Sequence, residues 1–115
     1  MTFRKINRVH FVGIGGIGMS GIAELLMNLG FQVTGSDINY SENVKRLESI
    51  GIKISIGHDS KNINSADAVV YSSAVPSDNP EIITAISKSI PVIRRAEMLG
   101  ELISLKQTSI AVGGT

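Results

Sequence analysis

The amino-acid sequence predicts an α/β fold, an open parallel sheet of about five strands with flanking helices. Strand-like and helix-like segments alternate along the 115 residues, which is the pattern of βαβ units. The first strand-like segment is almost continuously apolar, as expected for a strand with helices over both faces of its sheet. Directly after it come four glycines in six residues. A chain of this length forms one compact domain.

The strands are predicted from short apolar runs bounded by turn residues. They cover residues 8–12, 32–36, 53–56, 68–71 and 92–94, with a further strand at 109–112. Helices are predicted between them, over about 17–29, 41–50, 79–89 and 96–105. Ser41 can cap the second helix, and Asn79-Pro80-Glu81 is typical of a helix start: a cap, a proline in the first turn and an acid near the positive end of the dipole. Because the fourth strand pairs with the first in this topology, the turns that follow them share one crevice.

Composition excludes several classes of function. Eleven basic and ten acidic residues give a net charge of +1, which argues against a nucleic-acid partner. No apolar run reaches the roughly 20 residues of a membrane span, and no signal peptide is evident, so we expect a cytoplasmic protein. The chain has no cysteine, and its two histidines lie far apart, so no metal site is predicted. No nucleophile–base–acid pattern appears, and no catalytic residue is assigned.

The glycine run is the strongest functional motif. Gly13, Gly15 and Gly18 form G-x-G-x-x-G between a predicted strand and a predicted helix, the context in which this motif binds a diphosphate. The first glycine permits the tight turn, the second lets the pyrophosphate approach the backbone, and the third lets the helix pack near the strand. A side chain at Gly15 is therefore expected to displace the pyrophosphate while leaving the fold intact. The alternative is a tight turn without a ligand.

Four further residues lie at the ends of the second, third and fourth predicted strands, where they are candidates for the same crevice: Asp37, His58, Ser72 and Ser73. Asp37 lies 19 residues after Gly18, where Rossmann-like domains place an acid that binds ribose, although it is also a common turn or cap residue. Ser72 and Ser73 follow the fourth strand, and their hydroxyls suit either a nucleotide or a plain turn. On the residues alone, His58 is predicted to be a solvated loop residue and His10 to be packed in the core.

Taken together, these segments resemble the amino-terminal part of the bacterial Mur ligases, and among them the enzymes that add L-alanine. The run from His10 to Ala23 carries the resemblance first, and other matching segments follow in order. They are Gly35-Ser36-Asp37, Gly57-His58, Ser72-Ser73-Ala74-Val75, Asn79-Pro80-Glu81, Ile90-Pro91-Val92-Ile93, Arg95-Ala96-Glu97-Met98-Leu99 and Ile110-Ala111-Val112-Gly113-Gly114-Thr115.

The resemblance implies a three-domain enzyme that joins L-alanine to UDP-N-acetylmuramate, using ATP and Mg²⁺. Residues 1–107 would be its Rossmann-like UDP-sugar-binding domain, and 108–115 the first strand and truncated phosphate loop of the central ATPase domain. Domains absent from this chain would bind L-alanine and ATP, so the fragment is expected to be inactive and to need no cofactor itself. Gly114 and Thr115 would belong to the ATP site. The implied UDP-sugar ligands are Gly15, Gly16, Ile17, Gly18, Met19, Ser20, Asp37, His58, Ser72, Ser73 and Ala74.

One alternative function, from a different class of protein, is also consistent with the sequence. The glycine spacing and Asp37 also fit a dinucleotide (NAD)-binding Rossmann domain of a dehydrogenase, or of a ligand-sensing module.

Overall fold

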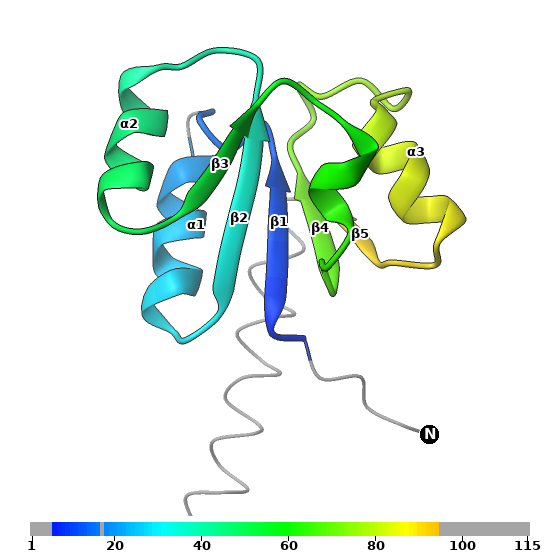
Figure 1. Cartoon of the computed structure of the whole chain (residues 1–115), viewed down its shortest axis with the longest axis horizontal. Helices are drawn as coiled ribbons and strands as arrows, with labels where there is room; N and C mark the ends of the chain where they lie inside the picture. Colours follow the sequence, from blue (N-terminus) through cyan, green and yellow to red (C-terminus); the bar gives the residue numbers. More distant parts are fainter. Residues whose placement is uncertain (1–5, 17, 95–115) are drawn as a thin grey trace, which may run out of the picture.

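A computed structural model describes residues 6–16 and 18–94 of the chain. Five strands form a single parallel sheet in the order β3-β2-β1-β4-β5 (Figure 1). The strands are β1 (Arg8–Val12), β2 (Gln32–Asp37), β3 (Lys53–Ile56), β4 (Ala68–Tyr71) and β5 (Val92–Arg94). The helices are α1 (Met19–Asn28), α2 (Glu42–Ser49), α3 (Pro80–Ser87) and a 3₁₀ helix (Ser60–Ile63).

The predicted fold class is confirmed, and the predicted elements occur within about two residues of their expected limits. The 3₁₀ helix was not predicted. Outside the described residues lie the helix expected at 96–105, the strand expected at 109–112, and Ile17, Gly114 and Thr115.

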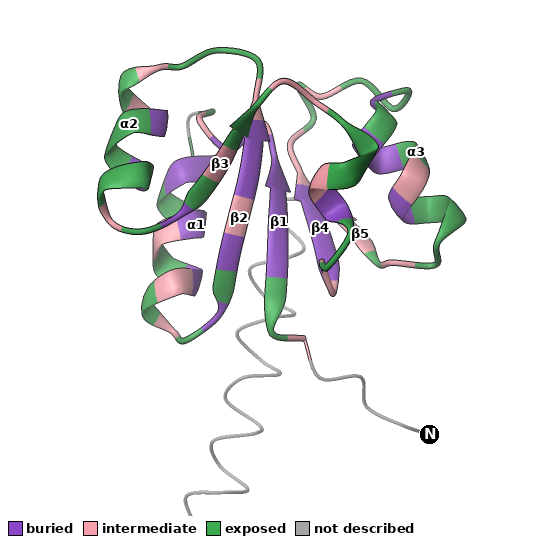
Figure 2. Cartoon of the chain, in the orientation of Figure 1, coloured by how far each residue is buried: buried purple, intermediate pink, exposed green. Residues whose placement is uncertain are grey.

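Helices cover both faces of the sheet. Helices α1 and α2 lie over one face, and α3 with the 3₁₀ helix over the other (Figure 1). Successive residues of β1 therefore point into two different apolar clusters: Phe11 packs with α1, and Val12 packs against Ala85 of α3. Strand β1 is buried along most of its length (Figure 2). This double covering explains why the sequence of β1 is almost continuously apolar.

The starts of the helices differ in a way that bears on the site. The side chain of Ser41 accepts a hydrogen bond from the backbone of α2, and that of Asn79 does the same for α3. Helix α1 has no side-chain cap and no acidic residue in its first turn; its N-cap is Gly18, with a φ of 84°. The positive end of the α1 dipole is therefore not neutralised by a side chain of its own first turn.

The order of the strands reverses at β1, which pairs with β2 on one side and β4 on the other. Val12 lies opposite Ser36 of β2 and opposite Tyr71 of β4, so the three strands end at one edge. In open α/β sheets this carboxyl edge is where ligands bind. Within residues 6–16 and 18–94, no helix combines the length and the apolar character that crossing a membrane requires.

Candidate functional site

The glycine loop between β1 and α1 is fastened to the end of β2. The amides of Gly13 and Ile14 both donate to the carbonyl of Ser36, at 2.8 and 3.0 Å. The side chain of Ile14 is fully buried against Gly35, where an added Cβ would lie 2.7 Å from the Cβ of Ile14. Gly35 thus serves packing, because only a residue without a side chain lets the loop sit this close to the strand.

Asp37 binds this loop directly. Its Oδ2 accepts a hydrogen bond from the Gly15 amide at 2.8 Å, and the side-chain amide of Asn43 donates to the Gly15 carbonyl at 3.1 Å. A Cβ on Gly15 would lie 2.9 Å from both Asp37 Oδ2 and Val44 Cγ2. The expectation that a side chain at Gly15 would disturb only a ligand is therefore wrong, since it would also meet these side chains of the protein.

The other loop residues divide into exposed and buried positions. Gly16 and Gly18 are exposed at the start of α1, where a bound anion would meet the helix dipole. Ser20, in the first helical turn, is 7% exposed. The side chain of Met19 is fully buried in the core, and its backbone amide donates to the Gly16 carbonyl. Met19 therefore anchors the glycine loop to the core.

The segment after β4 lies against the glycine loop, as the topology predicts. A Cβ on Gly13 would lie 3.2 Å from Val75 Cγ2, and the Val75 amide donates to the Ser72 carbonyl at 3.0 Å. Ser73 and Ala74 are exposed, and Ser72 is half-buried. In the part of the chain that the structure describes, the hydroxyls of Ser72 and Ser73 make no hydrogen bond, which leaves both available to a ligand.

A buried carboxylate lies on the opposite face of the sheet from α1. Glu81, in the first turn of α3, is fully buried, and its Oε1 accepts hydrogen bonds from His10 Nε2 at 2.7 Å and Ser36 Oγ at 2.8 Å. Its Oε2 accepts from the Asp59 amide at 3.0 Å and from Asn62 Nδ2 at 2.7 Å. The helix dipole also favours a negative charge at this position.

These contacts decide the ionisation of Glu81. Burial by itself would raise the pKa of its carboxyl group, but the hydrogen bonds from His10, Asn62 and Ser36 and the charge of His10 outweigh burial. The pKa of Glu81 falls from 4.5 to about 2. The carboxylate is therefore ionised at neutral pH.

His58 belongs to the same network. Its Nδ1 lies 2.9 Å from Ser36 Oγ and 3.5 Å from Glu81 Oε2, and its side chain is 17% exposed. The expectation of a solvated loop histidine is therefore wrong. The other expectation, that His10 is packed in the core, is confirmed, since it is 1% exposed.

The candidate residues gather at one edge of the sheet but divide between its two faces. Asp37 lies with Gly15 and the start of α2, whereas His58 lies with Glu81 of α3. Asp37 and His58 were candidates from the sequence, whereas Glu81 was predicted only to be part of a helix start. The sequence did contain an indication of this role for Glu81. The segment 79–81, which resembles the Mur ligases, places an acid directly after a helix cap and a proline, close to the carboxyl edge of the sheet.

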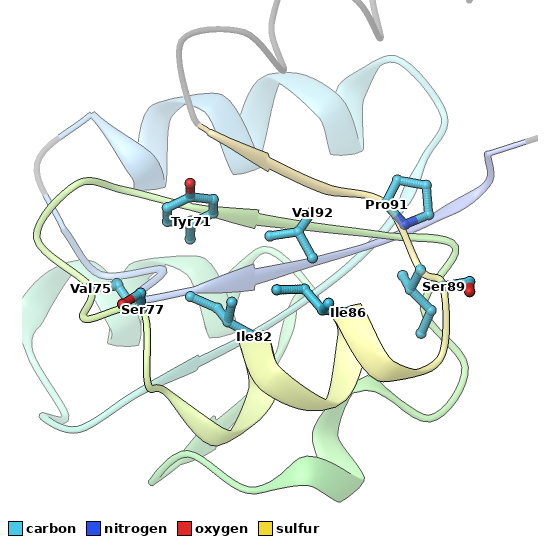
Figure 3. Close-up of a pocket in the computed structure, with 9 residues that line it drawn as sticks. Tyr71, Val75, Ser77, Ile82, Ile86, Ser89, Pro91 and Val92 are labelled. Atoms are coloured by element: carbon cyan, nitrogen blue, oxygen red, sulfur yellow. The ribbon is translucent and has the colours of Figure 1, made fainter.

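A separate apolar groove of about 560 Å³ lies between α3 and the strands β4 and β5. Ile82 and Ile86 of α3 point toward the strands there, and Tyr71 and Val92 face them (Figure 3). Val75, which adjoins the glycine loop, lies at one end of it. Val75 thus lies between the groove and the candidate site.

Comparison with known proteins places this arrangement in a family. Residues 8–107 match the family described as "Mur ligase family, catalytic domain". The UDP-N-acetylmuramate--L-alanine ligase of Granulibacter bethesdensis is 61% identical over 110 residues, and that of Xanthobacter autotrophicus 57% identical over 110; each match covers 96% of this chain and 23% of the relative. The crystal structure of UDP-N-acetylmuramate-alanine ligase MurC from Thermotoga maritima aligns with a TM-score of 0.79 and 37% identity, over 84% of this chain and 23% of that one.

The chain thus spans about a quarter of the length of the relatives it matches. The family match, by contrast, covers most of the chain, including the glycine loop, the segment after β4 and the start of α3. The chain belongs to the Mur ligase family.

Proposed function

We propose that this chain is the UDP-N-acetylmuramate-binding part of an ATP-dependent ligase that joins L-alanine to that sugar nucleotide in peptidoglycan synthesis in the cytoplasm. Residues 1–107 would form the UDP-sugar domain, and 108–115 would begin the ATPase domain. The substrate assignment is supported by relatives named UDP-N-acetylmuramate--L-alanine ligase, which are 57–61% identical over nearly the whole chain. ATP, Mg²⁺ and L-alanine would be bound mainly outside the described residues.

The geometric observation that carries the proposal is the meeting of two loops at the point where the strand order reverses. The uncapped start of α1 supplies a helix dipole for the diphosphate, and Gly16 and Gly18 leave it accessible. The hydroxyls of Ser72 and Ser73, which have no hydrogen-bond partner among the described residues, belong to the loop that touches Gly13. Asp37 keeps acceptor capacity for a ribose hydroxyl, because its carboxylate has about four acceptor sites and accepts only two hydrogen bonds here, from the Gly15 and Asn39 amides.

Isothermal titration calorimetry with UDP-N-acetylmuramate and with NADH distinguishes this function from dinucleotide binding. We expect UDP-N-acetylmuramate to bind more tightly. Replacing both Ser72 and Ser73 with alanine should weaken its binding about thirtyfold, since each of the two lost hydrogen bonds is worth about 1 kcal/mol. Ser87→Ala, a hydroxyl removed from the exposed far end of α3, is the matched control and should leave binding unchanged. Tighter binding of NADH would refute the proposal.

A further inference from the structure

Glu81 holds the segment that carries His58. It is the only acidic side chain that is fully buried among residues 6–16 and 18–94. Its Oε2 accepts from the Asp59 amide and from Asn62 Nδ2, and Asn62 Nδ2 also reaches the Gly57 carbonyl at 3.3 Å. One carboxylate on α3 therefore binds both Asp59, which caps the 3₁₀ helix, and Asn62 within that helix.

The number of hydrogen-bond donors and acceptors around Glu81 determines where the hydroxyl proton of Ser36 points. An ionised carboxylate only accepts hydrogen bonds and offers about four acceptor sites. Here His10, Ser36, Asp59 and Asn62 supply four donors. Because the hydroxyl of Ser36 has a single proton and donates it to Glu81, its oxygen is left as an acceptor for any other partner.

That other partner is His58 Nδ1, 2.9 Å from Ser36 Oγ. Since Ser36 accepts, Nδ1 must carry a proton, and Glu81 Oε2 at 3.5 Å from the same nitrogen favours this arrangement further. In a neutral imidazole one nitrogen donates and the other accepts. The neutral form of His58 is therefore the Nδ1–H tautomer, and its Nε2 is an acceptor.

The Nε2 atom of His58 is also accessible. No residue in the described ranges forms a hydrogen bond with it, and none of the buried side-chain nitrogens there lacks a partner. It follows that Nε2 reaches the surface, on the carboxyl-edge segment that follows β3.

We propose that Glu81, acting through Ser36, is a positioning residue that holds His58 in the Nδ1–H form, so that Nε2 accepts a hydrogen bond from an N–H or O–H group of the bound nucleotide. The identity of that ligand rests on the proposed function, whereas the tautomer does not. A uridine nucleotide offers both kinds of donor, the uracil N3–H and the ribose hydroxyls.

The tautomer is tested by two-bond ¹H–¹⁵N correlation spectra of the histidine-labelled 115-residue chain at pH 8. We expect His58 to show a protonated Nδ1 and an unprotonated Nε2, and Ser36→Ala to shift its population toward the Nε2–H form. Thr34→Val is the matched control: it removes a hydroxyl two residues earlier on β2, which contacts His10 Nδ1 at 2.8 Å, and should leave His58 unchanged. A proton on Nε2 in the unsubstituted chain, or an unaltered tautomer in Ser36→Ala, would overturn the proposal.

The ligand contact is tested by titrating the same three proteins with UDP, 2′-deoxy-UDP and UDP methylated at uracil N3. We expect Ser36→Ala to weaken UDP binding about tenfold, the effect of one misplaced hydrogen bond, and Thr34→Val to change it less than twofold. One of the two analogues lacks the group that donates a hydrogen bond to Nε2. That analogue should bind the unsubstituted chain and Ser36→Ala with equal affinity, which identifies the donor as the ribose 2′-hydroxyl or the uracil N3–H. Equal UDP affinity of both proteins, despite an altered tautomer, would refute the contact. Absence of UDP binding with the expected tautomer would instead refute the proposed function.

Discussion

Replacing Glu81 with glutamine should remove a large part of the acid sensitivity of this fold. The substitution keeps the size of the side chain and removes the charge that four hydrogen-bond donors surround. Burial alone would raise the pKa of Glu81, yet the hydrogen bonds from His10, Asn62 and Ser36 lower it to about 2. The folded protein therefore binds this proton only at a pH well below that at which the unfolded chain does.

The magnitude follows from the two pKa values. The unfolded carboxyl group titrates at its ordinary pKa of 4.5, and the folded one at about 2. Because the folded pKa is depressed, the stabilisation by the ionised Glu81 is fully present above pH 4.5 and is lost as the pH falls toward 2. At about 1.4 kcal/mol for each pH unit between the two values, the loss is about 3 kcal/mol.

The assay is urea unfolding of both proteins between pH 2 and pH 7, followed by far-ultraviolet circular dichroism. Glu81→Gln should be the less stable protein at neutral pH, and its deficit should shrink by about 3 kcal/mol between pH 5 and pH 2. All other carboxyl groups titrate in both proteins, so the difference isolates Glu81. Glu42→Gln, whose side chain is 89% exposed, should follow the unsubstituted chain at every pH. A deficit that stays constant across this range would refute the reasoning.

Three other predictions concern the loops and helix starts, each measured by urea unfolding at pH 7. Gly35→Ala should destabilise the fold by about 3 kcal/mol, because the added Cβ meets the Cβ of Ile14. Gly21→Ala is the control: an added Cβ there meets nothing within 4 Å, so this change should stabilise α1 by about 0.5–1 kcal/mol. Equal effects of the two substitutions on stability would contradict the packing role of Gly35. Gly15→Ala should cost about 1 kcal/mol, because the ends of the side chains it meets can shift, and should also weaken UDP binding in calorimetry; unchanged stability would show that the close packing there is unimportant. Ser41→Ala should cost about 1 kcal/mol through loss of the α2 cap, and a neutral result would show that water replaces the hydroxyl.

The fold was predictable because its signals are local. Apolar runs, caps and glycines define each strand and each α-helix of the described region, and the parallel order follows from their alternation. The 3₁₀ helix at Ser60–Ile63 was missed because four residues carry too little periodicity, and its core contact rests on one side chain, Ile63.

The candidate site was predictable only in part. The glycine loop was predicted from its G-x-G-x-x-G motif, and the segment at Ser72 from the rule that ligands bind at the carboxyl ends of strands, which depends on topology alone. The partners of Gly15 and His58 could not be deduced, because they depend on which way side chains point across the sheet. Asp37 turns inward to the loop, and Glu81 reaches three separate segments, contacts that no spacing rule specifies.

The buried Glu81 network also constrains how the chain folds. Its contact with His10 joins residues 71 apart in the sequence, and its contact with Ser36 joins residues 45 apart. Such long loops are closed only when β1, β2 and α3 have come together, so these contacts require all three elements to be in place. A nascent or partly unfolded chain can contain the glycine turn, but it cannot yet contain an oriented His58. This edge of the sheet can therefore bind a ligand only when the fold is complete. Hydrogen exchange of the Asp59 amide should accordingly require global rather than local unfolding.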